Sequence, residues 1–224
     1  MENNEKKLSK RQQKATEEYL VLDEQLRSQG YQPEKKVISI LKANIYALLI
    51  PGPFALLCFA LFKIFYWDTP IINTQEIVNL PLSQYTLHMI IKLMLFLVII
   101  IGLTFIHELT HAFVWGLCTG NHFKDVELGM MWSSLTPYCH CKSPLKMWQL
   151  RLGAFMPFVT AGLIPYIIGM LLGSGPLVGI ACMMMIGSGG DFTIMLLIRK
   201  EKSDQLVIDH PSECGCYVYR KTDV

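Results

Sequence analysis

Two histidines and a glutamate with the spacing of a metal site lie near the middle of the chain, in His107-Glu108-Leu109-Thr110-His111. On an α-helix, residues four apart project from one face, so the two imidazoles can bind one metal ion with the glutamate beside them. Zinc suits two histidine nitrogens and one further protein ligand, and it leaves a position for a water whose pKa it lowers. We therefore expect His107 and His111 to be zinc ligands and Glu108 to be the general base.

The pentapeptide lies inside a long apolar run, and the whole chain is apolar. Hydrophobic residues make up 52% of the 224 residues and charged residues only 17%, which is outside the range of an ordinary soluble domain. Ionisable side chains inside a membrane are costly unless they are paired or used, so the pentapeptide indicates function. The net charge of +2 gives no sign of nucleic-acid binding. We expect the basic residues to contact the anionic lipids of a bilayer.

The first half of the chain contains two stretches that are long enough to cross a bilayer. Residues 43–62 carry no charge and form the first predicted span, in which Pro51 and Pro53 predict a kink. Residues 89–117 form the second predicted span, with the pentapeptide in its second half. The polar residues before the first span lack the early apolar core of a cleaved signal peptide, so we expect none.

Two further spans follow, and they supply the third metal ligand. No charged residue lies between Arg151 and Asp191, and Gly173-Ser174-Gly175-Pro176 predicts a turn that separates a third span from a fourth at residues 177–198. Asp191 lies eight residues before Arg199, or about 12 Å deep at about 1.5 Å per residue. The histidines of the second span lie at about the same depth, about 12 to 18 Å. We therefore expect Asp191 to complete a zinc site with them.

The distribution of Lys and Arg predicts the orientation of the spans. Residues 1–42 hold nine of these residues and residues 199–224 hold five, whereas the loop at residues 68–86 has none. By the positive-inside rule, both termini are predicted to be cytoplasmic. We expect a cytoplasmic arm at residues 1–42, a transmembrane metalloprotease-like domain at residues 43–198 and a cytoplasmic tail at residues 199–224.

The predicted fold is therefore an all-α membrane protein, a bundle of about four transmembrane helices. Alternation of polar and apolar residues at 125–128 predicts a strand, and with it a small β-hairpin after the second span. Residues 206–209 and 216–220 predict a second hairpin in the tail. Glycines at 187, 189 and 190 have two interpretations, close packing of the fourth span on the second or a looser backbone beside Asp191.

Other soft ligands are present, but their spacing is unlike that of a zinc knuckle. Cys139 and Cys141, like Cys214 and Cys216, are separated by one residue, so we expect reduced thiols without a metal. An odd number of cysteines, seven in all, also argues against a disulfide framework. His210 lies in a polar segment and is predicted to be solvated.

The chain resembles intramembrane zinc metalloproteases of the site-2 protease type. It resembles more closely a bacterial family described as putative zincin peptidases. The resemblance covers about residues 102–219 and is carried by three segments, residues 107–111, Cys141-Lys142-Ser143-Pro144-Leu145 and Gly187-Ser188-Gly189-Gly190-Asp191. It implies that His107, His111 and Asp191 bind Zn²⁺ and that Glu108 activates water. Site-2 proteases carry glycine after the aspartate, whereas here glycine precedes it.

The expected function is that of an intramembrane zinc metalloprotease, in a multi-pass protein of the bacterial cytoplasmic membrane. Its substrate would be a membrane-embedded or membrane-adjacent protein or peptide, and the strand at residues 125–128 could pair with an extended substrate. Two alternatives remain open, a zincin-like membrane scaffold without proteolytic activity and a zinc or proton transporter. Glu108 separates the three, because only a protease needs it for cleavage.

Overall fold

The computed structural model describes residues 10–72, 79–131 and 136–221. Four helical segments within them are long and apolar enough to cross a membrane, which confirms the four predicted spans. Three of these segments consist of more than one helix. In chain order the spans are α2 (Ile40–Leu49) with α3 (Gly52–Phe65), then α4 (Leu82–Cys118), then α5 (Met147–Pro157) with a π-helical turn (Phe158–Leu163) and α6 (Ile164–Leu172), and finally α7 (Gly175–Gly187) with α8 (Gly189–Leu197).

The first span is divided where two prolines interrupt its backbone hydrogen bonds. α2 ends at Leu49 and α3 begins at Gly52, with Pro51 between them in helical conformation. Because proline has no backbone N–H, Pro51 and Pro53 remove two helical donors within one turn. The predicted kink is thus a boundary between two helices. The predicted turn between the third and fourth spans is confirmed, since Gly173 ends α6 with a positive φ of 61°.

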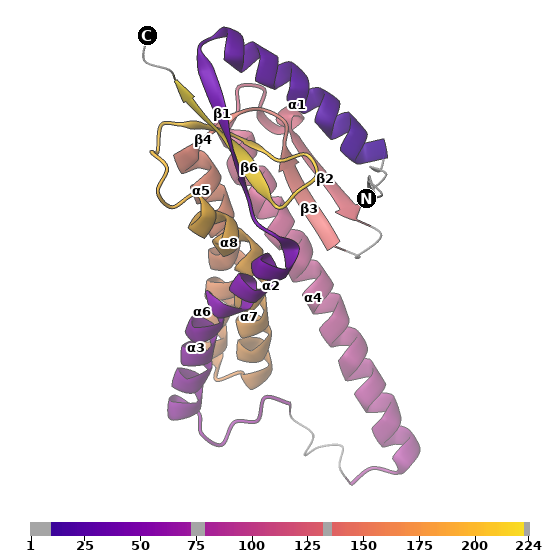
Figure 1. Cartoon of the computed structure of the whole chain (residues 1–224). Coiled ribbons are helices and arrows are strands. Elements are labelled where there is room, and N and C mark those ends of the chain that lie inside the picture. The colour runs from indigo at the N-terminus through magenta and orange to yellow at the C-terminus, as the bar shows by residue number, and fades with distance from the viewer. Residues whose placement is uncertain (1–9, 73–78, 132–135, 222–224) are drawn as a thin grey trace, which may run out of the picture.

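A four-stranded antiparallel sheet gathers at one end of the helices (Figure 1). Its strand order is β1-β6-β5-β4, and its members come from before the first span, between the second and third spans, and after the fourth. The strands are β1 (Tyr31–Val37), β4 (Leu145–Lys146), β5 (Leu206–Asp209) and β6 (Gly215–Lys221). Segments at both ends of the chain therefore lie on the same side of the helices. That this side is cytoplasmic stays a prediction.

The expected hairpin after the second span is confirmed, and the all-α expectation is corrected. β2 (Val126–Met131) pairs with β3 (Thr136–Cys141) in a separate two-stranded sheet, and the predicted tail hairpin is the β5–β6 pair. The protein is mostly helical, at 65%, with these small antiparallel sheets. The four-stranded sheet escaped prediction because β1 contains Pro33 and three charged residues, a composition unlike that of a strand. Helix α1 (Lys10–Ser28) packs on the sheet through Tyr19 and Leu26.

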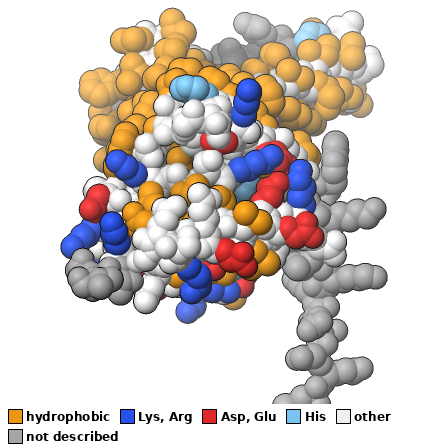
Figure 2. Space-filling model, turned by 90° about the horizontal axis from the view of Figure 1, so that it is seen from above, with side chains coloured by type: hydrophobic (Ala, Val, Ile, Leu, Met, Phe, Trp, Pro, Cys, Tyr) orange, Lys and Arg blue, Asp and Glu red, His pale blue; other side chains and the backbone are white. Residues whose placement is uncertain are grey.

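The surface divides into an apolar part and a charged part. The N-terminal half of α4 diverges from the other helices, and its side chains are largely exposed and apolar (Figure 1). Charged side chains gather instead over the end that carries the sheet, with hydrophobic side chains behind them (Figure 2). Large exposed apolar surfaces suit lipid and not water. This division is consistent with a multi-pass membrane protein.

Candidate metal centre

The structure brings His107, His111 and Asp191 together. The two histidines lie one turn apart on α4 and are buried, and Asp191 lies in the first turn of α8. Nε2 of His107 is 3.2 Å from Oδ2 of Asp191, and Nε2 of His111 is 3.3 Å from Oδ1 of the same carboxylate. One ligand atom from each of the three residues lies within 4.8 Å of the others. Residues from the second and fourth spans therefore meet at one level, as the depth argument predicted.

His111 is held on two further sides by its neighbours. Its Nδ1 is 2.9 Å from the carbonyl oxygen of Gly153 in α5. An N–H at Nδ1 that donates to this carbonyl leaves the lone pair of Nε2 free to face a metal. The indole of Trp115, one turn further along α4, stacks on the imidazole with ring centroids 4.9 Å apart. The ring of His111 is thus oriented from outside the group of ligands.

Gly153 is required by this arrangement because the indole lies directly on its backbone. A Cβ atom at Gly153 would lie 1.9 Å from Nε1 of Trp115. The indole N–H is buried and has no hydrogen-bond partner among the described residues, so Trp115 contributes by packing. Sequence reasoning found neither residue. The spacing of Trp115 four residues after His111 could have indicated a contact, whereas nothing in the sequence singles out Gly153.

The donor set fits zinc. Two imidazole nitrogens and one carboxylate oxygen are the ligands of several catalytic zinc sites, which keep the fourth position for water. Nε2 of each histidine lies 3.2 or 3.3 Å from an oxygen of the Asp191 carboxylate, so the three side chains are close enough to share one ion. Among the described residues, no other group of three His, Cys, Asp or Glu side chains meets in this way. The roles of these residues as zinc ligands stay a prediction.

Glu108 faces the two-stranded sheet. It follows His107 on α4, and the backbone of Cys139 in β3 lies within reach of its carboxylate. β3 packs on α4, with Leu128 opposite Cys139 and Val126 opposite Cys141. Residues that lie opposite each other share one face of an antiparallel pair, so this face of the hairpin is apolar. The hairpin therefore covers the candidate site on the side where the sheets gather.

The cysteines near the site do not form a second metal group. Cys141 and Cys216 are buried in the same apolar cluster as Trp115. Burial raises the pKa of the Cys141 thiol to about 12 and that of the Cys216 thiol to about 12 as well. Thiolates are the forms that bind metals and attack electrophiles, so these thiols are unreactive near neutral pH. All seven cysteines are free thiols.

The prediction for His210 is wrong, because its side chain is only 5% exposed. Its Nδ1 accepts hydrogen bonds from the backbone N–H groups of Ser212 and Glu213, and its ring stacks on Tyr217. Burial lowers the pKa of this imidazole. His210 therefore serves as a neutral acceptor that shapes the turn between β5 and β6.

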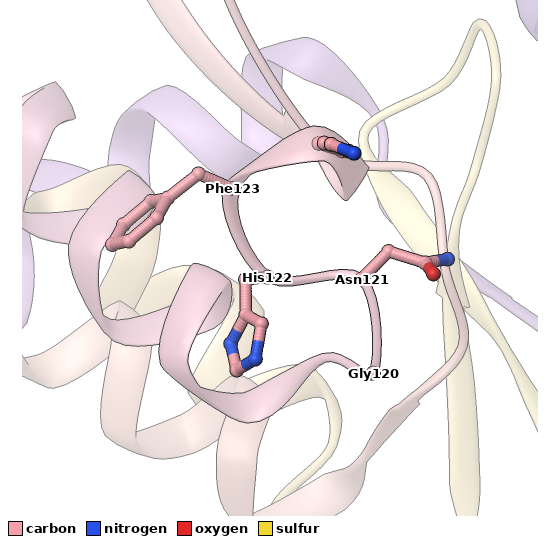
Figure 3. Close-up of a pocket in the computed structure, with 5 residues that line it drawn as sticks. Gly120, Asn121, His122 and Phe123 are labelled. Carbon is pink, nitrogen blue, oxygen red and sulfur yellow. The ribbon is translucent and has the colours of Figure 1, made fainter.

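An open pocket of about 470 Å³ lies away from the candidate ligands, at the loop that follows α4. It is lined by residues 120–124, and Figure 3 shows that the side chains of Asn121, His122 and Phe123 point in different directions. Phe123 packs toward Gly116, where a Cβ atom would lie 2.6 Å from its ring. No converging set of polar side chains lines this pocket. Among the described residues, it is the histidine-aspartate site, and not this pocket, that brings metal-binding side chains together.

A helix that carries His-Glu-x-x-His, with a carboxylate from a second helix, is an arrangement typical of a zinc peptidase. Residues 100–206 match the model of a family described as "Putative zincin peptidase". This segment contains the pentapeptide, Gly153 and Asp191, so the expected resemblance to this family is confirmed for it. No curated protein and no solved structure matches the chain. The resemblance to site-2 proteases stays a prediction.

Proposed function

We propose that the protein is a membrane zinc metalloprotease that hydrolyses a peptide bond of a membrane-embedded or membrane-adjacent protein. The observation that carries this proposal is the meeting of His107 and His111 from α4 with Asp191 from α8, within helices that can span a membrane. The match of residues 100–206 to a zincin peptidase family supports the same reaction class.

The side chains of the site have distinct roles in this reaction. His107, His111 and Asp191 would hold the zinc ion, and a bound zinc would supply a Lewis acid that lowers the pKa of a water and polarises a carbonyl. Glu108, on the same helix as the histidines, accepts the proton of the attacking water and then delivers it to the leaving amine. Gly153 keeps His111 in the tautomer that presents Nε2 to the metal.

Among the described residues, no strand pairs with the outer edge of β3, and an extended substrate could add there. The backbone N–H of Lys142 donates to the carbonyl of Asp125, and hydrogen-bonded pairs alternate along an antiparallel ladder. The backbone groups of Cys139 therefore point away from β2, toward the side where Glu108 lies. A substrate strand that pairs with this edge would pass beside the general base. Sequence reasoning assigned this role to residues 125–128, and the structure favours the partner strand instead.

Zinc content of detergent-purified protein, measured by elemental analysis after incubation with zinc and removal of the excess, tests the proposal. We expect about one zinc per chain in the wild type and in Glu108→Gln, and a sharp loss in Asp191→Ala. A folded wild-type protein without zinc would overturn the proposal.

Proteolysis needs a second measurement, on the protein reconstituted in liposomes with a panel of single-span membrane proteins. Mass spectrometry should find fragments with the wild type and none with Glu108→Gln. Zinc binding with identical product profiles for the two proteins would reject the protease in favour of a scaffold.

A further inference from the structure

The first turn of α8, which carries Asp191, is seated on the backbone of α2 (Figure 1). A Cβ atom at Gly189 would lie 1.8 Å from the carbonyl oxygen of Ala47 and 2.5 Å from its carbonyl carbon. Both atoms of Ala47 belong to the backbone, which cannot rotate away as a flexible side chain can. Only glycine therefore fits at position 189 in this packing.

The carbonyl that Gly189 meets has lost its helical donor. In an α-helix the oxygen of Ala47 would accept from the N–H of residue 51, but Pro51 has no N–H. The oxygen carries a partial negative charge, and it lies at the N-terminal, positive end of α8. Pro51 thus leaves the carbonyl of Ala47 without a helical donor at the place where α8 contacts α2.

The same packing directs Asp191 toward the histidines. Residues two apart on a helix project about 200° apart, so Gly189 and Asp191 lie on opposite sides of α8. Thr193, one turn after Gly189 and on the same side, also lies against α2, because its Oγ1 donates to the carbonyl of Gly189 at 2.9 Å and is 3.4 Å from the carbonyl oxygen of Ala43. One side of α8 is therefore fixed against α2, and the other side presents the carboxylate to α4.

We propose that Gly189, seated on the carbonyl of Ala47, is a positioning residue that holds Asp191 in place for metal binding. The inference rests on the proposed zinc site and extends it to the first span, which lies outside the segment that matches the zincin peptidase family. It also bears on the two interpretations of the glycines, because the close packing at Gly189 is not against the second span. The contact is with the first span, and the backbone is interrupted at Ser188 between α7 and α8.

Three alanine variants of neighbouring glycines test the proposal in the full-length protein in detergent. Gly189→Ala introduces the clash, whereas Gly187→Ala and Gly190→Ala are matched controls because a Cβ atom at either position meets nothing within 4 Å. Zinc affinity is measured by competition with a fluorescent chelator. We expect Gly189→Ala to bind zinc about 10- to 100-fold more weakly, as when an outer partner of a metal ligand is lost. Both controls should match the wild type.

The visible absorption of the Co²⁺-substituted protein gives a second readout, which a merely structural role would not change. Its intensity should fall in Gly189→Ala, because a displaced carboxylate alters the coordination, and should stay constant in the controls. If Gly189→Ala has the zinc affinity and the Co²⁺ spectrum of the wild type, α2 can move to accommodate the Cβ atom. That result would overturn this inference and leave the proposed function standing. A wild-type protein that binds no zinc would overturn the proposed function and this inference together.

If Gly189→Ala does not fold, a second pair of variants tests whether the carbonyl of Ala47 positions α8 for zinc binding. Pro51→Ala returns an N–H that can draw the carbonyl of Ala47 back into the helix, so zinc affinity should fall without any added bulk. Pro53→Ala is its control, because the oxygen it would engage belongs to Leu49 and not to Ala47. Equal zinc affinities in these two variants would overturn the proposal.

Discussion

The substitution Gly153→Ala should disturb the metal centre from outside the group of ligands. Its Cβ atom would lie 1.9 Å from Nε1 of Trp115 and 2.5 and 2.6 Å from two ring carbons. Non-bonded carbon atoms keep about 3.5 Å, so one partner must move by more than an ångström. Trp115 is only 6% exposed and packs on His111, and it has little space to retreat.

The movement should lengthen the contact between the carbonyl of Gly153 and Nδ1 of His111. This distance is 2.9 Å, and N–H···O bonds weaken beyond about 3.2 Å. Loss of such a partner lowers metal affinity about 10- to 100-fold, or about 1.4 to 2.7 kcal/mol. Chelator competition in detergent would measure it. Gly102→Ala on α4, where a Cβ atom meets nothing within 4 Å, should bind zinc as the wild type does.

A second substitution, at Trp115, tests whether the clash with the indole causes the loss of zinc affinity in Gly153→Ala. Trp115→Leu removes the flat five-membered ring whose Nε1, Cδ1 and Cε2 atoms a Cβ atom at Gly153 would meet, and it loses no hydrogen bond because no described residue partners the indole N–H. The double variant should therefore recover most of the zinc affinity lost in Gly153→Ala. Undiminished zinc binding in Gly153→Ala, or a double variant as weak as the single one, would refute the steric account.

Three further outcomes are expected. Burial would raise the pKa of Glu201, but hydrogen bonds with Arg220 and a lysine outweigh it, so the pKa lies below its ordinary value of 4.5. The stabilisation is present above that pH and is lost as pH falls through the folded pKa, so Glu201→Gln should lower the Tm at pH 7 and have no effect in strong acid. Its thermal unfolding at several pH values checks this, and a difference independent of pH would contradict it. Cys141 and Cys216 should resist iodoacetamide at neutral pH until the protein unfolds, which peptide mass spectrometry would show, and rapid native alkylation would disprove their burial. Zinc removal by a chelator should lower the Tm of the wild type and leave that of Asp191→Ala unchanged, because only a bound ion contributes to stability, and equal shifts in both would argue against this site.

The spans and the three converging side chains could be predicted because the signals are local or follow from depth. Charged residues mark the ends of the apolar runs, and helical spacing places His107 and His111 on one face. Asp191 was identified as the third candidate ligand because its depth matches theirs. None of these signals depends on which helices touch each other. The structure confirms that all four apolar stretches are helical and long enough to cross a membrane.

The supports of the site could not be predicted because they depend on pairings between distant segments. Gly189 gave the correct signal of close packing, but the sequence did not say that its partner is Ala47 in the first span. β1 was missed for the same reason. Its charged residues are accommodated by partners far along the chain, as Lys35 is by Glu213 at 2.5 Å. Such residues look solvated when only the sequence is considered.

The pairing of β1 with β6 sets an order of events during synthesis. β1 precedes the first span, and every residue of it lies opposite a residue of Gly215–Lys221, so the strand has no partner until the chain has been made to that point. Only two residues separate β1 from α2, the helix on which α8 rests. The sheet edge next to α2 is therefore completed only after translation of the last strand. A chain that stops before residue 215 would contain His107, His111 and Asp191 but would leave β1, which lies next to α2 in the sequence, without its partner strand.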